Sequence, residues 1–476
     1  MEREFMVSVE KLTHLKIEAD PRRVLLRPFN PGGRERWQRI LNSLAGLAEE
    51  ETGRQYRQVV TLFNSRHRHL ENFLTRRLRT LQAEFPEVNN WSETRQKLAA
   101  AHFTHEYSVE AAALFNPSMV WHPDQSGLPS GSKRFILGLR ATGEGHISSL
   151  TFQTGIVSEA GEVELEPRYS YLESGTVEPE PLLKREVVQR RAGGVVSPDD
   201  LQINETQEFA RRSEWLERLA LPADAAASVS RLLSTDYDVD FDPELPLSGR
   251  LIFPATADES NGIEDFRFVE FTGEAGASTY YATYTAYDGR QITPKLLATK
   301  DFLHFELRSL SGPAVSNKGF ALFPQKIGGK YVMLSRQGGE ENRIMFSDYL
   351  DYWEESRLLM RPRQDWEIIQ LGNCGSPLLT EAGWLVLSHG VGAMRRYSIG
   401  AFLLDRNDPE RVIGSLKQPL ITPEEGEREG YVPNVVYSCG GQIIGDWLII
   451  PYAMSDVACT FARVPLSRLL DELTAK

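Results

Sequence analysis

The sequence predicts a mainly β protein: a five-bladed β-propeller that follows an α-helical region and carries a partly helical insertion. Three observations support this fold. Apolar residues recur at helical spacing before residue 84, short strands bounded by turn residues dominate from Phe115 onward, and one strand–turn–strand pattern recurs five times. We therefore expect a helical region over residues 1–114 and a propeller over 115–476, with its insertion at about 156–250.

Helices are expected over residues 34–83 and from Glu93 to Ala101. In the first stretch, apolar side chains recur every three or four residues, which is the spacing of one buried helix face. Pro86 ends this run, because proline cannot continue a helix. Such apolar stripes must be buried, so we expect the helices to cover one propeller face or to form the interface of a homo-oligomer.

The repeated unit is an apolar strand, a turn and an aromatic strand. Its five copies lie at residues 116–152, 264–287, 320–336, 377–391 and 435–452. Copies two to five are about 55 residues apart, close to the length of a propeller blade. The first gap is longer because of the insertion, in which we expect an exposed loop at Glu178–Pro181 and a helix from Glu205 to Leu233. A β-sandwich is the alternative architecture.

Composition and cysteine usage exclude several protein classes. Hydrophobic content of 41% and charged content of 25% are ordinary for a globular protein. No apolar run approaches the ~20 residues that cross a bilayer, and no secretory signal is visible. The three cysteines are widely spaced, without a CxxC pair, as is typical of the reducing cytoplasm. With a net charge of −13, the chain is expected to bind neither nucleic acid nor membrane.

The strongest functional signal is the segment from Asn261 to Arg267, which a tyrosine-rich strand follows. Side chains alternate along a strand, so Asp265 and Arg267 are expected on one face and Glu264 on the other. A carboxylic acid beside a guanidinium, among tyrosines, suits the proton donor of a sugar-cleaving enzyme. For this fragment alone, a structural ion pair near a turn is the alternative.

Five motifs, in order, resemble those of glycoside hydrolase family 130. They are Phe115–Ser118 leading into Leu139–Arg140, Gly262–Arg267, Leu322–Lys326 leading into Gly329–Tyr331, Gly383–Leu385 leading into His389–Val391, and Val432–Val436 with Tyr452–Asp456 downstream. The resemblance covers roughly residues 115–470. It implies a five-bladed propeller that cleaves β-mannosides with inversion, mostly by phosphorolysis and in some members by hydrolysis.

The resemblance also implies roles for individual residues. Asp265 is expected to donate the proton, acting through a sugar hydroxyl. Lys326 matches a lysine associated with β-1,2-linked mannosides. The residues expected to bind substrate are Asn116, Glu264, Arg267, Tyr284, Lys326, Asn434 and Asp456. Those expected to bind inorganic phosphate, the co-substrate, are Arg140, Lys318, Arg336 and His389. No other cofactor and no metal ion is expected.

Three of the residues singled out also have an ordinary structural interpretation. His389 lies between apolar neighbours and, without the family match, would be a core histidine. Lys326 lies in a hairpin, where lysine is usually solvated. His146 is either a ligand of the site or a turn histidine.

The chain departs from the family pattern where phosphate would bind. Ser335–Gln337 replaces a His-Arg-Pro run, and Gln370–Gly372 replaces Lys-Ile-Gly. Two cationic or imidazole groups are therefore missing, although the four remaining candidates can still neutralise a phosphate. We expect phosphorolysis, giving mannose 1-phosphate. The alternatives are an inverting β-1,2-mannosidase that activates water with Glu354 or Glu355, and a non-catalytic glycan-binding propeller.

Overall fold

The computed structural model describes residues 7–193, 208–219, 221–273 and 276–475. It divides into two compact units. We call residues 20–111 and 169–173 the helical unit, and residues 1–19, 112–168 and 174–476 the β unit. No helix in the described part of the chain combines the length and the apolar character needed to span a bilayer.

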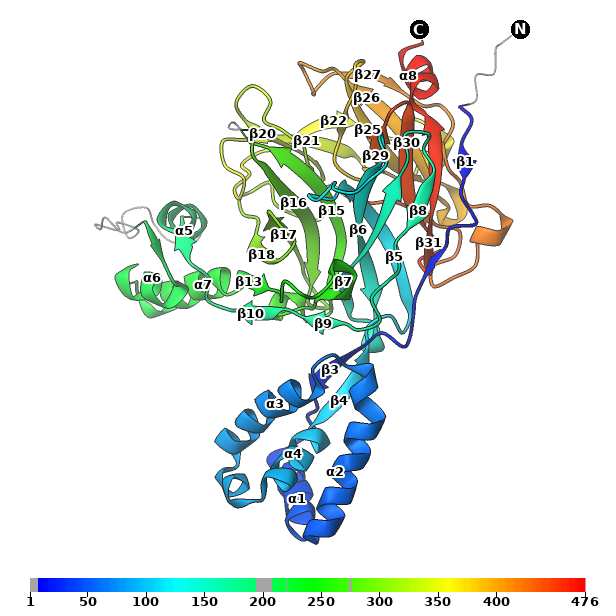
Figure 1. Ribbon diagram of the computed structural model, residues 1–476. Coiled ribbons are helices and arrows are strands. Elements are labelled where there is room, and N and C mark those ends of the chain that lie inside the picture. Colours follow the sequence, from blue (N-terminus) through cyan, green and yellow to red (C-terminus); the bar gives the residue numbers. More distant parts are fainter. Residues whose placement is uncertain (1–6, 194–207, 220, 274–275, 476) are drawn as a thin grey trace. The chain divides into compact units, whose positions relative to one another are not determined.

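The helical unit has a core of apolar side chains from four α-helices (Figure 1): α1 (Arg34–Ala45), α2 (Glu49–Phe63), α3 (Leu70–Glu84) and α4 (Glu93–His102). The helices predicted over residues 34–83 and 93–101 are confirmed, with breaks at 46–48 and 64–69. In the core, the Trp37 ring stacks on Phe103 and Phe85, at centroid distances of 4.6 and 5.7 Å.

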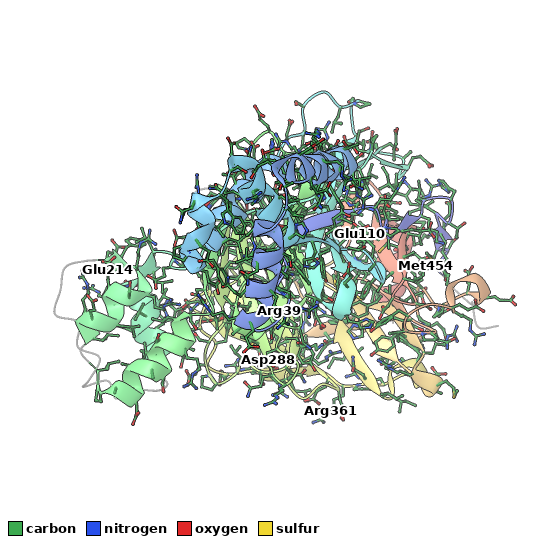
Figure 2. The ribbon with its side chains drawn as sticks, turned by 90° about the horizontal axis from the view of Figure 1, so that it is seen from below. Arg39, Glu110, Glu214, Asp288, Arg361 and Met454 are labelled. Atoms are coloured by element: carbon green, nitrogen blue, oxygen red, sulfur yellow. The ribbon has the colours of Figure 1, made fainter. Side chains whose placement is uncertain are left out.

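A short antiparallel sheet accompanies these helices and consists of β3 (Val24–Pro28) and β4 (Thr104–Ser108). Beside it, Arg23 and Glu110 form a buried ion pair of 3.0 Å. Glu110 is labelled in Figure 2, as is Arg39 of α1. The ion pair therefore joins the segment that enters the helical unit to the one that leaves it.

The β unit contains five antiparallel sheets of four or more strands among its described residues (Figure 1). Apart from the short strands β1, β2, β10 and β13, their strands follow one another along the chain. The first sheet includes β5 (Ala113–Trp121), β6 (Lys133–Thr142), β7 (Ser148–Val157), β8 (Val163–Leu165) and β14 (Arg250–Ile252). The second consists of β15 (Ile263–Thr272), β16 (Ser278–Tyr287), β17 (Ile292–Thr299), β18 (His304–Ser309), β13 (Tyr237–Asp240) and β10 (Thr176–Glu178). The short strand β9 (Glu173–Ser174) lies at the boundary between the two units.

The remaining three sheets complete the unit. The third consists of β19 (Lys318–Leu322), β20 (Tyr331–Arg336), β21 (Asn342–Ser347) and β22 (Arg357–Met360). The fourth consists of β23 (Gln370–Asn373), β24 (Leu378–Leu379), β25 (Trp384–Val391), β26 (Tyr397–Leu404) and β27 (Val412–Ser415). The fifth consists of β28 (Val436–Tyr437), β29 (Gln442–Ile444), β30 (Trp447–Met454), β31 (Ala458–Pro465), β1 (Glu10–Lys11) and β2 (Ile17–Glu18). A final helix, α8 (Leu466–Thr474), follows β31.

The two ends of the β unit meet in this fifth sheet. Both β1 and β2 pair antiparallel with β31, so that Lys11 lies opposite Ala462 and Ile17 opposite Cys459. Residues 1–19 therefore belong to the β unit, although the sequence pattern grouped them with the helical region. The mainly β class is confirmed.

The insertion forms a small helical subdomain with its own core. It contains β11 (Leu183–Lys184), α5 (Arg185–Ala192), β12 (Phe209–Ala210), α6 (Arg212–Leu219) and α7 (Ala223–Leu233). Of the helix expected from Glu205 to Leu233, residues 205–207 lie outside the described residues and residues 209–210 form β12. The helical part consists of α6 and α7, and Pro222 directly precedes α7. Glu178, expected in an exposed loop, instead ends β10 and pairs with β13. Figure 2 labels Glu214 on α6, where its carboxylate faces Arg218 one turn later.

Candidate active site

Asp265 lies in a bulge at the start of β15. Its φ of 55° is in the left-handed region, and the pairing with β16 shifts between Glu264 and Arg267. A bulge breaks the alternation of side chains along a strand. As a result, the carboxylates of Glu264 and Asp265 both reach the Arg140 guanidinium, at 2.7 Å and 3.4 Å respectively. The predicted placement of Glu264 on the opposite face from Asp265 is therefore wrong.

The same irregularity occurs at the start of two neighbouring sheets. Pairing shifts between Phe115 and Ser118 in the first sheet and between Lys318 and Ala321 in the third. Asn116, which lies inside the first of these bulges, has a φ of 50°. Left-handed backbone costs a non-glycine residue about 1–3 kcal/mol and is concentrated at functional sites. The three bulges therefore mark one end of the sheets as a candidate site.

The bulges bring polar side chains from three sheets together. Asn116 donates from Nδ2 to Asp265 Oδ1 at 2.7 Å. Lys318 donates from Nζ to Glu264 Oε2 at 3.1 Å. Arg140 completes the group, because its Nε also donates to Ser148 Oγ at 2.9 Å and this bond fixes the orientation of the guanidinium. The Asp265 carboxylate is thus held by one amide and one cation.

Arg267 links this group to the fifth sheet. Its guanidinium donates to the backbone carbonyl of Asp265 at 3.2 Å and to the Tyr437 hydroxyl at 2.7 Å. Tyr437 is buried, and burial raises the pKa of its phenol, so the group is neutral. Sequence reasoning missed Tyr437, although it lies one residue beyond the Val432–Val436 motif. No local signal distinguishes it, since its partner Arg267 is 170 positions away.

His389 is a neutral hydrogen-bond acceptor in the structure. Its Nε2 accepts from Arg336 Nη1 at 2.9 Å and faces Gln370 Nε2 at 3.1 Å. A guanidinium can only donate, so Nε2 of His389 carries no proton. Burial and then the charges of Arg336 and Arg267 lower the pKa of His389 well below its usual value. His389 therefore adds no positive charge to the expected phosphate site, and its contribution is to hold Arg336.

Arg336 is a buried cation without a counterion. Its residue is 9% exposed, and within the described ranges no carboxylate lies at ion-pair distance from it. Its Nε is buried and makes no hydrogen bond to any described residue. Burial lowers the pKa of the guanidinium, and neighbouring Arg267 lowers it further. A buried charge without a partner is unfavourable, so Arg336 is suited to an anionic ligand.

The environment drives the pKa values of two nearby carboxyl groups apart. Burial favours the protonated form of Asp265, but Arg140, Arg267 and Lys318 outweigh it and lower its pKa to about 2. Burial has the larger effect on Asp456, in the turn between β30 and β31. With the negative charges of Asp265 and Glu264, burial raises the pKa of Asp456 to about 6 against the opposing charge of Arg140. Carboxyl groups whose pKa values are driven apart in this way commonly differ in function.

Tyr284 and Lys326 are not brought to this group. Register pairs Arg267 with Thr283, so the next residue, Tyr284, lies on the other face of β16. There its hydroxyl donates to Glu259 at 3.0 Å. Lys326 lies in the β19–β20 turn, at the opposite end of β19 from Lys318, and its ammonium is 4.8 Å from the Tyr331 ring. Strand β19 alone separates its ends by roughly 13 Å. Neither residue therefore contacts the group around Asp265.

Asn434 lies at the same end of the fifth sheet as the site, two residues before β28. Its φ is 62°, its side chain accepts from Arg428 Nε at 2.7 Å, and its carbonyl accepts from the Tyr397 N–H at 3.1 Å. Among the described residues, no hydrogen bond joins it to Asp265. His146 is exposed in the β6–β7 turn, where it neighbours Tyr431.

The two glutamates considered as bases for hydrolysis lie elsewhere. Glu354 accepts from the Tyr352 hydroxyl at 2.8 Å, and Glu355 pairs with Arg357 at 2.7 Å. Both are exposed and lead into β22, the edge strand of the third sheet. Three strand spacings, roughly 14 Å, separate β22 from β19, which carries Lys318. These glutamates therefore cannot activate water beside Asp265.

Comparison with known proteins connects this geometry to a family. The model of glycoside hydrolase family 130, described as beta-1,4-mannooligosaccharide phosphorylase, matches residues 246–475. A 1,2-beta-oligomannan phosphorylase from Thermoanaerobacter sp. (strain X514) is 37% identical over 208 residues, which span 42% of this chain and 67% of the relative. A beta-1,2-mannobiose phosphorylase from Listeria innocua is 31% identical over 230 residues, spanning 47% and 63%. A solved structure of beta-1,2-mannobiose phosphorylase from Listeria innocua covers 77% of this chain and 93% of its own at 21% identity, with a TM-score of 0.45.

Proposed function

The chain belongs to glycoside hydrolase family 130, and we propose that it cleaves β-1,2-linked manno-oligosaccharides with inversion, by phosphorolysis, to release mannose 1-phosphate. The names of its relatives, a 1,2-beta-oligomannan phosphorylase and a beta-1,2-mannobiose phosphorylase, support the substrate class. The chain spans 67% and 63% of the length of those relatives.

The observation that best supports phosphorolysis is the excess of positive charge at the site. Its main contributor is the buried guanidinium of Arg336, which has no carboxylate partner among the described residues. Four cations, Arg140, Arg267, Lys318 and Arg336, outnumber the carboxyl groups beside them, which are Glu264, Asp265 and Asp456. Phosphate brings a charge of about −1.5 to −2 at neutral pH. It also needs no general base, because it is already nucleophilic. A cationic site of this kind therefore favours phosphate over water as the nucleophile.

In this mechanism, Asp265 supplies the proton that the departing sugar oxygen takes up, relayed through a sugar hydroxyl. A phosphate oxygen forms the new bond to the anomeric carbon while the bond to the bridging oxygen breaks, which inverts the configuration. In the free protein, a pKa of about 2 keeps Asp265 ionised. Phosphate among the same cations offsets their effect and raises that pKa, so the acid can hold its proton when both substrates are bound.

The two alternatives have less support. An inverting β-mannosidase needs a base beside the reacting carbon, and Glu354 and Glu355 lie on the edge of another sheet. Asp456 is a further carboxyl group that could act as this base. A glycan-binding module without catalysis has no need for the network of Arg140, Glu264, Asp265 and Lys318.

Cleavage of β-1,2-mannobiose with and without inorganic phosphate tests the proposal. We expect mannose 1-phosphate to appear only when phosphate is present, with a rate that saturates as phosphate increases. Release of free mannose at the same rate in phosphate-free buffer would identify the chain as a hydrolase.

The same proposal extends to the architecture. We propose that the five large sheets are the blades of a five-bladed propeller, that residues 115–476 form this catalytic domain, and that the site lies at one mouth of its channel. Sequential order of the sheets supports this, as do the bulges at the start of β5, β15 and β19. A crystal structure in which the first strands of all five sheets surround one axis is the expected result.

We also propose that the protein is cytoplasmic and forms homo-oligomers through its helical unit. The three cysteines are buried free thiols, which suits a reducing compartment. Leu62 on α2 is 55% exposed, which suits a further contact. Light scattering of the whole protein and of Leu62→Glu is the test, and an unchanged mass in the variant would exclude an interface at α2.

A further inference from the structure

Two exposed aromatic side chains, from segments that connect strands of separate sheets, contact each other at the end of the β unit that carries the site. His146 lies in the turn between β6 and β7, and Tyr431 lies in the segment before β28. Their ring centroids are 5.7 Å apart with planes at 33°, and the Tyr431 hydroxyl is 3.4 Å from His146 Nδ1. Tyr431 is nevertheless 54% exposed. The pair thus presents a large aromatic surface to solvent.

The segment that carries Tyr431 is anchored by a buried carboxylate. Glu427 is 6% exposed and accepts from Lys11 Nζ and from the Tyr452 hydroxyl, both at 2.6 Å. Ser455 Oγ donates to the Glu427 carbonyl at 2.6 Å, and the Val432 N–H donates to the Ser455 carbonyl at 3.1 Å. Tyr431 therefore leaves a segment that is tied down on both sides. An aromatic ring on a fixed backbone loses little conformational entropy when a ligand binds.

The pair borders the candidate site. On one side, the His146 turn follows β6, whose residue Arg140 contacts both Glu264 and Asp265. On the other, Tyr431 lies between Gly430 and Val432, and the Val432 N–H donates to the carbonyl of Ser455, the residue before Asp456. The reacting charges are buried, whereas the aromatic pair is exposed. A sugar chain with its terminal unit among those charges must leave toward solvent, and the pair is exposed on segments that adjoin the residues of the site.

We propose that His146 and Tyr431 form the platform for the second and later sugar units beyond the cleaved linkage, so that chains of three or more mannose units are preferred over the disaccharide. This inference rests on the proposed function. The C–H face of a pyranose ring packs well on an aromatic ring. The Tyr431 hydroxyl and the His146 ring nitrogens supply donors and acceptors for sugar hydroxyls at the edge of the pair.

Kinetics with substrates of two lengths test the platform. In Tyr431→Ala, kcat/KM for β-1,2-mannotriose is expected to fall about five- to tenfold, the effect of losing one aromatic contact, through KM and not kcat. Activity on β-1,2-mannobiose is expected to change less than about twofold, since that substrate is too short to reach the platform. Tyr431→Phe, which keeps the ring, should retain the preference for the longer chain.

Tyr349→Ala is the matched control. Tyr349 is 47% exposed and packs against Arg190. It follows the C-terminal end of β21, the opposite end of that strand from Asn342. It should leave both substrates unaffected. An equal loss on both substrates in Tyr431→Ala, or no loss on either, would overturn the inference.

Calorimetric titration without phosphate separates this inference from the proposed function. If the unmodified protein shows no phosphate-dependent cleavage, phosphorolysis fails, but binding of the two oligosaccharides can still be compared. Weaker binding of the trisaccharide alone in Tyr431→Ala supports the platform. Unchanged trisaccharide binding, or no binding of either sugar by the unmodified protein, rejects it.

Discussion

Asn116 donates a 2.7 Å hydrogen bond to the carboxylate of Asp265, a residue 149 positions later in the chain. Both residues lie in bulges near the start of an edge strand, β5 or β15, and both have left-handed backbone, with φ of 50° and 55°. Two bulges of the same kind therefore place an amide donor against the proposed acid. Several predictions depend on this arrangement and on the charges around it.

Asp265→Asn should lower turnover of an unactivated β-mannoside by roughly 10²–10⁴, the usual effect of losing a general acid. The amide keeps the shape of the side chain but cannot supply the proton. Product release over time is the measurement, with circular dichroism to check the fold. Asp288→Asn, in the β16–β17 turn labelled in Figure 2, is the control and should remain active. Near-normal turnover by Asp265→Asn would mean that another acid acts, and Glu264 would be examined next.

Asn116→Gly should lower activity while the backbone conformation at this position is kept. Loss of a hydrogen bond to a charged group costs about 1.5–3 kcal/mol, so turnover should fall roughly ten- to hundredfold if the bond persists in the transition state. Glycine adopts a φ of 50° without strain, which offsets part of the loss of this bond in the folded state, so the free energy of unfolding should fall by less than about 3 kcal/mol. Steady-state kinetics and urea denaturation measure the two effects. A variant that is both fully active and less stable would show that Asn116 has only a structural function.

Arg336→Met should raise the KM for phosphate at least about tenfold, because a charge-assisted contact to the anion is lost. The KM for the mannoside should change much less. The same variant should unfold at a higher temperature than the wild type, since methionine replaces a buried cation without a counterion.

Arg361→Met is the control for this change. Its side chain is 71% exposed, beside Glu341, and it is labelled in Figure 2. Neither phosphate dependence nor melting temperature should respond to it. If Arg336→Met leaves the phosphate KM unchanged, phosphate binds elsewhere or is not a substrate.

The free energy of unfolding should decrease as the pH rises from about 4 to about 6, because of Asp456. Its pKa is raised from 3.8 to about 6, so the folded state binds more protons than the unfolded state in this window. Stability therefore decreases as pH rises, by on the order of 3 kcal/mol. Asp456→Asn should flatten this part of the curve, measured by chemical denaturation at successive pH values.

Asp405→Asn provides a comparison of opposite sign. Its hydrogen bond to Arg411 lowers the pKa of Asp405 to about 2, so its contribution is present above pH 4 and is lost as pH falls toward 2. This variant should alter only the acid side of the curve. A slope between pH 4 and 6 that persists in Asp456→Asn would assign it to another group.

Local patterns in the sequence were sufficient to predict the helices of the helical unit, the mainly β class and the family. Helical spacing depends on residues three or four positions apart, and strand–turn repeats on a few more, so both are readable without tertiary contacts. The motifs likewise named Arg140, Asp265 and Arg336, which the structure brings into one neighbourhood. Residue type at these positions follows from the chemistry that they serve.

Tertiary structure alone decided which side chains meet. A bulge, and not strand alternation, places Glu264 beside Asp265, and register turns Tyr284 away from Arg267. The neutral state of His389 depends on Arg336, which comes from another sheet and lies 53 positions earlier. Tyr437 joins the group only through a partner 170 positions away. Such contacts depend on backbone irregularities and on packing between distant segments, and neither leaves a local pattern in the sequence.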